Sequence, residues 1–229
     1  MEREELRLGK ALTEERSWEA DGVTVLTAAV TLPQAEGESR RARRFNRCYR
    51  RFCRAYLAYC GQLLLPAAAE AFRAAQSVSA PWEPARAALG YRVSLQTDAV
   101  WSIVCDARET MHGAPSFRVR RADVWDTGAG LPMALGEFFP PHTRCARALL
   151  CFARGEALRR VEGGAAYRAN WRAMLRRALD TRNFCLTEEG LCFFYPLCAV
   201  ASAKEGIVSF TMPYDAEKGP FPPPLTART

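Results

Sequence analysis

Residues 40–63 read RRARRFNRCYRRFCRAYLAYCGQL. Apolar side chains recur in this segment at i, i+3, i+4 and i+7, the spacing that marks one face of an α-helix. They are Phe45, Cys48, Tyr49, Phe52, Tyr56, Tyr59, Cys60 and Leu63. Arginines occupy the opposite face, at positions 43, 44, 47, 50, 51 and 54. The pattern predicts an amphipathic helix with an aromatic, buried side and an arginine-rich outer side.

The positive charge of the chain is concentrated in the same segment. Removing the eight arginines of residues 40–54 from the formal net charge of +7 leaves −1. Guanidinium groups bind carboxylates and phosphates through paired hydrogen bonds, so a face of this kind suits an anionic ligand or an acidic partner. The first candidate partner-binding residues are therefore Arg43, Arg47, Arg50 and Arg54.

A second interpretation of the arginine-rich face stays open. The 32 basic residues include 29 Arg and 3 Lys, a bias that a GC-rich genome produces without selection for binding. The face would then serve only to solvate the helix. A nucleic acid is the less favoured anion, because the chain has no zinc finger, glycine-rich phosphate loop or aromatic-basic RNA-binding motif.

Composition sets the broad class of the protein. With 229 residues, 49% hydrophobic and 25% charged, the chain is globular and forms one large domain or two small ones. No apolar stretch approaches the roughly 20 residues that span a bilayer. The acidic start, Met1–Leu6, is unlike a secretory signal, so we expect a chain without signal or membrane helix in the cytoplasm.

Cysteine is abundant in the chain, with nine residues and no CxxC pair. An odd count argues against a full disulfide framework, and most of the cysteines have apolar neighbours. We therefore expect reduced, mostly buried thiols. Because only His112 and His142 could add imidazole ligands, no metal or cofactor site is predicted.

Periodicity and turn residues outline the remaining elements. A β-branched strand at residues 21–32 ends at Pro33 and precedes the long helix, about 38–76, which Pro66 should kink or split. A period of two then marks an antiparallel meander, followed by two helices, a hairpin and a last strand. Their ranges are 91–95, 100–106 and 117–125 for the meander, 143–160 and 167–179 for the helices, 183–187 with 191–196 for the hairpin, and 207–213 for the last strand.

These elements predict an α+β fold with antiparallel sheets packed against helices in two subdomains. The N-terminal subdomain covers residues 1–84 and the C-terminal one residues 85–215. Residues 216–229, which contain Pro220 and Pro222–Pro224, should form an extended, mobile tail.

Several short motifs resemble one known family. The string Asn183-Phe184-x-Leu186-Thr187-x-x-Gly190-Leu191, continuing to Phe194-Tyr195-Pro196 and to Met212-Pro213-Tyr214, is similar to the end of the RsiV-like domain. The turn Asp126-Thr127-Gly128, followed by Leu131, Leu135 and Phe138-Phe139, resembles another part of it. The family includes the extracellular, lysozyme-binding region of RsiV anti-sigma factors and a non-catalytic region of some peptidoglycan deacetylases.

The resemblance implies a non-catalytic domain that recognises a protein or a cell-envelope ligand. His112 and Tyr195 lie in its motifs and complete the candidate partner-binding residues. His112 with Cys105 is unsuited to nucleophilic catalysis, because two strand residues seven apart do not meet without a bend. A strongly basic partner such as lysozyme is disfavoured, since the arginine face would repel it, and an acidic protein or anionic polymer suits the charge better.

Overall fold

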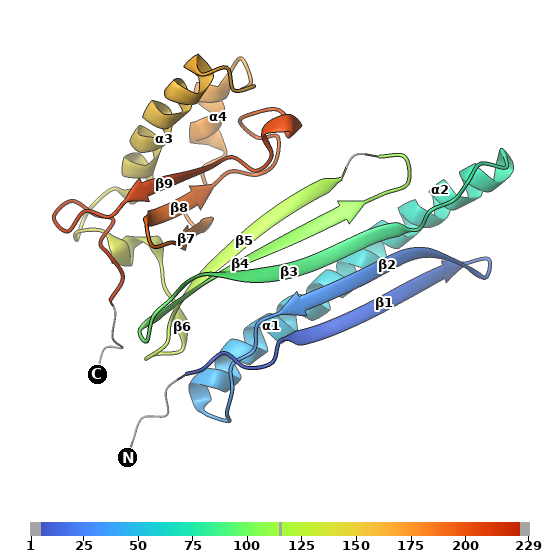
Figure 1. Cartoon of the computed structure of the whole chain (residues 1–229), viewed down its shortest axis with the longest axis horizontal. Helices are drawn as coiled ribbons and strands as arrows, with labels where there is room; N and C mark the ends of the chain where they lie inside the picture. Colours follow the sequence, from blue (N-terminus) through green and yellow to red (C-terminus); the bar gives the residue numbers. More distant parts are fainter. Residues whose placement is uncertain (1–5, 115, 225–229) are drawn as a thin grey trace. The chain divides into compact units, whose positions relative to one another are not determined.

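The protein divides into two compact units in a computed structural model that describes residues 6–114 and 116–224. Unit 1 comprises Met1–Tyr91 with Cys105–Arg118, and unit 2 comprises Arg92–Val104 with Val119–Thr229. The fold is α+β, as predicted, with one six-stranded sheet in the order β1-β2-β3-β4-β5-β6 and one three-stranded sheet in the order β7-β8-β9 (Figure 1). The boundary expected at residue 84 differs from this division, because residues 85–91 and 105–118 cluster with unit 1.

Unit 1 begins with a β-hairpin. Strands β1 (Leu12–Ala20) and β2 (Val23–Leu32) pair antiparallel from Leu12↔Leu32 to Ala20↔Val23. Asp21 and Gly22 connect them with φ values of 52° and 76°, the left-handed conformation that tight hairpin turns require. The sequence analysis predicted only the second strand of this hairpin.

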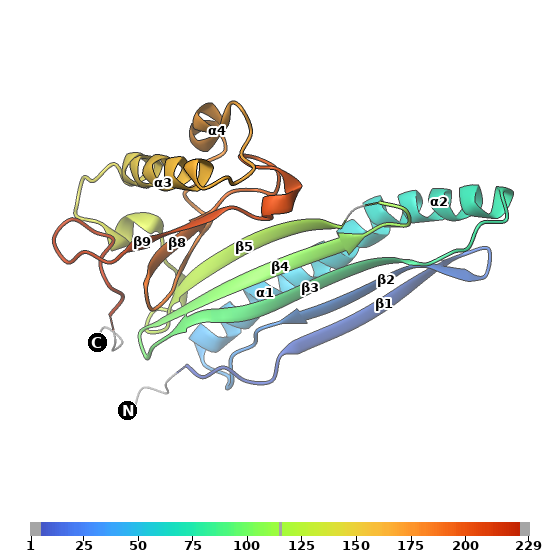
Figure 2. The same cartoon turned by 45° about the horizontal axis from the view of Figure 1, so that its top comes forward.

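Helix α1 (Arg40–Tyr59) packs against β1 and β2, and Figure 2 shows it running along one face of the sheet. Ser39 caps its start, where the Ala42 N–H donates to the Ser39 Oγ at 3.2 Å. The predicted amphipathic pattern is confirmed for Phe45, Tyr49 and Tyr56, which are buried together with Ala42, Cys53 and Leu57. Leu63, expected on the buried side, is 63% exposed, because it lies in the π-helix after α1, where the wider turn shifts the face that a side chain occupies.

Pro66 interrupts the long helix, as predicted. A π-helix (Cys60–Leu64) separates α1 from α2 (Leu65–Ser77), and the Leu65 N–H donates to the Cys60 carbonyl. Proline lacks an N–H and its ring crowds the preceding turn, so it fits only where a helix starts. The wider π turn ends one helix and lets a second begin with proline in its first turn.

Strand β3 (Ala85–Gln96) runs parallel to β2, with Leu26 opposite Ala85 and Val30 opposite Leu89. The antiparallel prediction is wrong for this pair. The helical crossover α1–α2 carries the chain back to the end at which β2 began, and a parallel partner is the result. The meander predicted at 91–95, 100–106 and 117–125 matches the neighbouring strands β3, β4 (Val100–Thr110) and β5 (Phe117–Asp126). The next strand of the sheet, β6 (Leu131–Pro132), was not predicted.

Unit 2 places helices α3 (Cys145–Glu162) and α4 (Trp171–Arg177) beside the small sheet, and α3 contacts β9. The predicted hairpin and last strand are present as β7 (Phe184–Leu186), β8 (Gly190–Phe194) and β9 (Ser209–Pro213), paired antiparallel. The core of the unit includes the aromatic group Phe193, Tyr195 and Phe210, with ring centroids 5.7–6.3 Å apart.

The proline-rich segment packs within unit 2, contrary to the extended, mobile tail expected. The Phe221 N–H donates to the Phe138 carbonyl at 2.6 Å, and the Thr97 hydroxyl donates to the Pro224 carbonyl at 3.1 Å. Gly219 and Pro220 are buried. These backbone hydrogen bonds fix the segment as far as Pro224, and the rest of the predicted tail, 225–229, lies outside the described residues.

Candidate functional site

A groove in unit 1 brings together the four arginines that the sequence singled out. Its volume is about 670 Å³. Helix α1 supplies one wall, β1 supplies the opposite wall, and the chain just before α1 closes one end. We call it the arginine groove and define it by its lining: Leu12, Glu14, Gly37, Glu38, Arg43, Asn46, Arg47, Arg50, Cys53 and Arg54.

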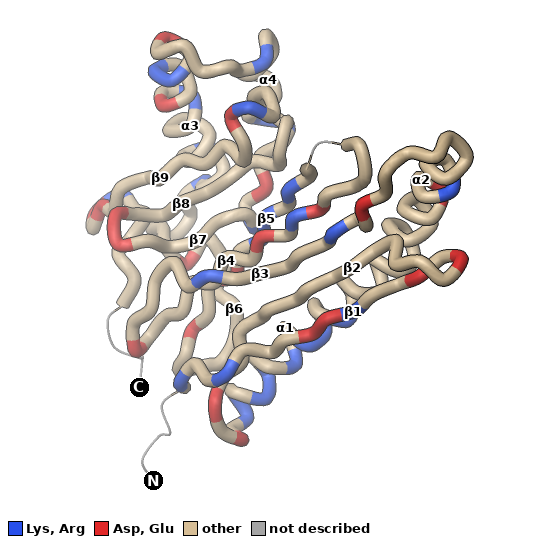
Figure 3. The backbone as a smooth tube through the Cα atoms, turned by 45° about the vertical axis from the view of Figure 1, so that its right-hand side comes forward, with Lys and Arg blue, Asp and Glu red and all other residues tan. Residues whose placement is uncertain are grey.

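Helical geometry explains why these arginines form a row. Successive steps of four, three and four residues return to nearly the same side of a helix that has about 3.6 residues per turn. Figure 3 shows basic residues repeating along α1. The row borders the buried face of the helix, and all four side chains, Arg43, Arg47, Arg50 and Arg54, are exposed.

Positive charge dominates the groove. Four guanidinium groups face two carboxylates in the lining, Glu14 and Glu38. Arg50 donates from Nε to the Gln34 Oε1 at 3.2 Å, a hydrogen bond that orients the guanidinium without neutralising it. Among residues 6–114 and 116–224, no ion pair neutralises Arg43, Arg47 or Arg54.

Two residues of the groove lining, Cys53 and Asn46, are held by burial and by hydrogen bonds respectively. Cys53 is buried there, and burial is the main cause that raises the pKa of its thiol, with the nearby Glu14 adding to the rise. A thiol with a raised pKa stays protonated and is a poor nucleophile. Asn46 accepts from the Ala35 N–H at 2.7 Å and donates to the Ala35 carbonyl at 2.9 Å, which ties α1 to the chain after β2.

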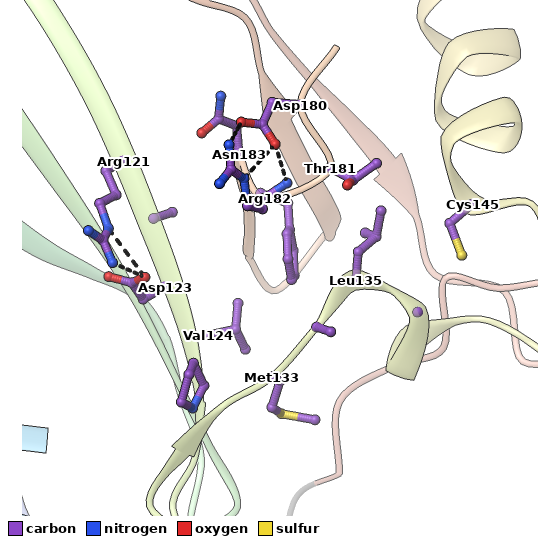
Figure 4. A pocket seen from close by; sticks show the side chains of 15 residues that line it. Arg121, Asp123, Val124, Met133, Leu135, Cys145, Asp180, Thr181, Arg182 and Asn183 are labelled. Carbon is purple, nitrogen blue, oxygen red and sulfur yellow. Dashed lines mark hydrogen bonds and ion pairs between the residues drawn. The ribbon is translucent and has the colours of Figure 1, made fainter. Parts of the chain in front are cut away.

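Unit 2 holds a second candidate site, a pocket of about 770 Å³ shown in Figure 4. We call it the unit 2 pocket. Its apolar part is made by Val124, Leu135 and Phe184, which belong to the core, and by Met133. The polar part of the lining comes from β5 and from the segment before β7: Arg121, Asp123, Asp180, Thr181, Arg182 and Asn183.

Each arginine of the unit 2 pocket has a carboxylate partner two residues away in sequence. Arg182 donates from Nε to Asp180 Oδ1 at 3.1 Å and from Nη2 to Asp180 Oδ2 at 2.9 Å. These hydrogen bonds are the main cause that lowers the pKa of the Asp180 carboxyl. Arg121 and Asp123 pair at 3.0 Å. The pocket is therefore nearly neutral along its polar part.

His112 lies on an exposed turn after β4. Its ring centroid lies 4.8 Å from that of Trp82, with 32° between the ring planes. Cys105, the thiol considered with it, is buried on β4. Within the described part of the chain, no group of three or more His, Cys, Asp and Glu side chains is arranged to hold a metal ion.

Tyr195 does not lie at the surface. It is 0% exposed and packs between Phe193 and Phe210, with ring centroids 6.3 and 5.9 Å away. Burial is the main cause that raises the pKa of its hydroxyl. The residue was a candidate for partner contact, but its ring belongs to the core of unit 2, because the aromatic body outweighs the single hydroxyl.

Sequence reasoning missed the residues that face the arginine row and those of the unit 2 pocket. The β1 wall, with Leu12 and Glu14, could have been inferred from the Asp21-Gly22 turn signal, which implies a strand before it as well as after it. Asp180 and Arg182 carried no comparable signal, because the pocket depends on contacts between segments far apart in sequence.

Comparison with known proteins finds similarity to a family whose function is unknown. Residues 153–215 match the family model described as protein of unknown function (DUF3298). Over the whole fold, the chain is similar to a crystal structure of a DUF3298 family member from Bacteroides fragilis, with 13% identity, a TM-score of 0.63, and coverage of 91% of this chain and 90% of that one.

A DUF3298 family protein from Pseudomonas aeruginosa PAO1 is also similar, with 12% identity, a TM-score of 0.55, and the same coverage of 91% and 90%. At such identities the likeness is one of fold. No curated protein matches the chain significantly. None of the helices in the described residues combines the length and the apolar character that crossing a membrane requires.

Proposed function

We propose that this protein is a non-catalytic binding protein that recognises an acidic partner protein through the arginine groove. The observation that supports it most directly is the row of exposed guanidinium groups on α1, three of which have no carboxylate partner within the described residues. Unneutralised charges in a concave surface attract and orient an oppositely charged group.

Guanidinium chemistry favours carboxylates as the group recognised. Each planar fork of an arginine fits the two oxygens of a carboxylate, and the row repeats such forks along the axis of α1. An extended segment that carries Asp and Glu at intervals could engage several of them at once. Glu14 and Glu38 would repel badly aligned carboxylates and so contribute to specificity.

The resemblance of the motifs to the RsiV-like domain supports a role in protein recognition rather than catalysis. Lysozyme itself, the ligand of RsiV, is a poor candidate, because a strongly basic protein would meet the arginine row with like charge. The groove chemistry agrees with a non-catalytic role, since its one thiol, Cys53, is held in the neutral form.

Binding of a model acidic polymer tests the proposal. Fluorescent poly-L-glutamate should bind the wild-type protein at low salt, and the affinity should fall as salt rises. The variant R43E/R47E/R50E should bind at least tenfold more weakly. A matched variant, R144E/R147E/R154E, removes the same charge from three exposed positions on and next to α3 and should retain most of the affinity.

Two results would count against the proposal. Equal losses in the two triple variants would show that net charge, and not the groove, attracts the polymer. Absence of polyglutamate binding by the wild-type protein at low salt would remove the proposal altogether. Groove-dependent binding of a short DNA duplex that is much tighter than polyglutamate binding would favour a nucleic-acid binder instead.

A further inference from the structure

Two cysteines of unit 2 face each other across neighbouring strands. Cys185 on β7 and Cys192 on β8 are direct partners in the antiparallel register. Directly opposed residues of such a pair have Cα atoms about 4.5 or 5.5 Å apart and point to the same face of the sheet. Disulfides span Cα separations of about 4.4–6.8 Å. The register therefore places the two sulfur atoms within reach of one bond.

This pairing of cysteines is particular to one hairpin. Among the described strands, cysteine occurs only in β4, β7 and β8. The neighbours of β4 in its sheet, β3 and β5, contain no cysteine. In the described sheets, Cys185 and Cys192 are thus the one pair of thiols that strand register brings together.

The two thiols differ in their exposure to solvent. Cys185 is 1% exposed and lies in a small apolar cluster with Val104, Ala122 and Phe194. Cys192 is partly exposed at the edge of the same cluster. A small solute can therefore reach the second sulfur more readily than the first.

Neighbouring groups favour the thiolate at Cys192. A hydrogen bond with Cys185 is the main cause that lowers the pKa of the Cys192 thiol; Thr211 and the positive charges of Arg120 and Arg92 also lower it, against the effect of burial. The same hydrogen bond raises the pKa of the Cys185 thiol. A thiolate beside a protonated thiol and two guanidinium groups is the arrangement of a reactive cysteine with a resolving partner.

We propose that Cys185 and Cys192 are a redox-active dithiol that a hydroperoxide converts to an intramolecular disulfide. The Cys192 thiolate attacks the distal oxygen of the hydroperoxide, whose O–O bond breaks to give Cys192 sulfenic acid and, after protonation, an alcohol or water. The sulfur of Cys185 then attacks the Cys192 sulfur, loses its proton and releases water. Two thiols lose two electrons and two protons in all, and the hydroperoxide is the species reduced.

Peptide mapping of the oxidised protein tests the inference without any variant. Wild-type protein is treated with one equivalent of hydrogen peroxide, blocked with an alkylating agent, and digested with trypsin and a glutamate-specific protease. Cleavage after Glu188 or Glu189 separates the two cysteines, so a disulfide should join the peptide of Cys185 to that of Cys192. Its mass should be lower than that of the two reduced peptides by two hydrogen atoms, and a dithiol reductant should restore them.

Variants sharpen the test. Cys198 follows Cys192 in the same peptide, so C198S is the matched control and should still form the link, whereas C192S should lose it. C185S should leave a sulfenic acid at Cys192 that a dimedone probe traps. R92Q should slow alkylation of Cys192 at neutral pH several-fold, because one positive charge is removed and a smaller fraction of the thiol is ionised.

Other outcomes overturn the inference. A peroxide-induced link that persists in C192S would assign the chemistry to other thiols. Conversion of Cys192 to sulfinic acid in the wild-type protein, with no disulfide, would show that Cys185 does not resolve the sulfenic acid. Equal oxidation of all nine cysteines would mean that the pair has no special reactivity.

Discussion

The arginine groove and the unit 2 pocket are similar in volume, but they differ in whether their arginines are paired with carboxylates. In the groove, arginines repeat along one helix, and three of them have no ion-pair partner among the described residues. In the pocket, Arg121 and Arg182 each pair with an aspartate two residues away. The pocket uses arginine to order its own lining, whereas the groove leaves its charge available for a partner.

The contrast also concerns what each site contributes to folding. The wall of the unit 2 pocket is part of the core, so changing it changes stability. The arginine row lies outside the core, and its repeated like charges work against the helix that carries it. A surface that lowers stability is understandable where it serves binding.

A substitution in the apolar wall of the unit 2 pocket should have the largest effect on the free energy of unfolding. Phe184 is 5% exposed and meets the ring of Phe138 at 6.0 Å. F184A should lower the free energy of unfolding by about 3–5 kcal/mol, because a buried aromatic ring is replaced by a cavity. Urea unfolding measures the loss. The control is F117A, at a position that is 50% exposed, and it should change the free energy of unfolding little. Equal losses in the two variants would show that the pocket wall contributes no more to stability than the surface does.

Charge reversal should act with opposite sign in the two sites. R47E places a carboxylate four residues from Arg43 and Arg51, replacing two repulsions on α1 with attractions, and should raise the free energy of unfolding by about 0.5–1 kcal/mol. R182E should lower it, because it removes the partner of Asp180 and brings two carboxylates together. Denaturant titration of both variants gives the signs. A lower free energy of unfolding for R47E would mean that Arg47 makes stabilising contacts within the protein.

Acid should affect the unit 2 pocket through Asp180. Its pKa is lowered in the folded state by the hydrogen bonds from Arg182, so the pair stabilises the protein above the unfolded pKa and loses that contribution as pH falls through the folded pKa. Below about pH 4, wild type should lose its advantage over D180N. Because Arg182 is largely exposed and Asp180 is half-buried, solvent screens the pair and the effect should be small. E188Q, in the exposed hairpin turn, is the control.

Salt should have the smallest effect on the free energy of unfolding, and the effect should be a stabilisation of helix α1 in unit 1. Screening weakens the repulsion along α1, so the free energy of unfolding of the wild-type protein should rise by a few tenths of a kcal/mol between low and high sodium chloride. R47E should show a smaller rise or a fall. Thermal unfolding at several salt concentrations compares the two, and parallel curves would indicate that the arginines do not repel one another measurably.

Local patterns in the sequence predicted what local physics controls. The amphipathic character of α1 follows from side-chain spacing alone, and the break at Pro66 follows from a missing N–H. The hairpin of β7 and β8 follows from two apolar runs around a glycine turn. Strand β1 escaped prediction because its sequence, LTEERSWEA, is mostly polar, as is common for a strand with one unpaired edge.

Features that depend on distant segments could not be read in this way. The parallel pairing of β2 with β3 depends on where the helical crossover returns the chain. Tyr195 was assigned to the surface because a tyrosine suits both a core and an interface. The arginines of the groove were predicted, but the opposing wall with Glu14 was not, since it required β1.

The division of β3, β4 and β5 between the two units has a consequence for how the gene can vary. Unit 1 is encoded by two stretches, Met1–Tyr91 and Cys105–Arg118, and the stretch between them, Arg92–Val104, belongs to unit 2. No single cut separates the coding sequence into one unit and the other. A continuous segment that carries all of unit 1 therefore also carries Arg92–Val104 of unit 2, so recombination of one such segment cannot exchange unit 1 by itself.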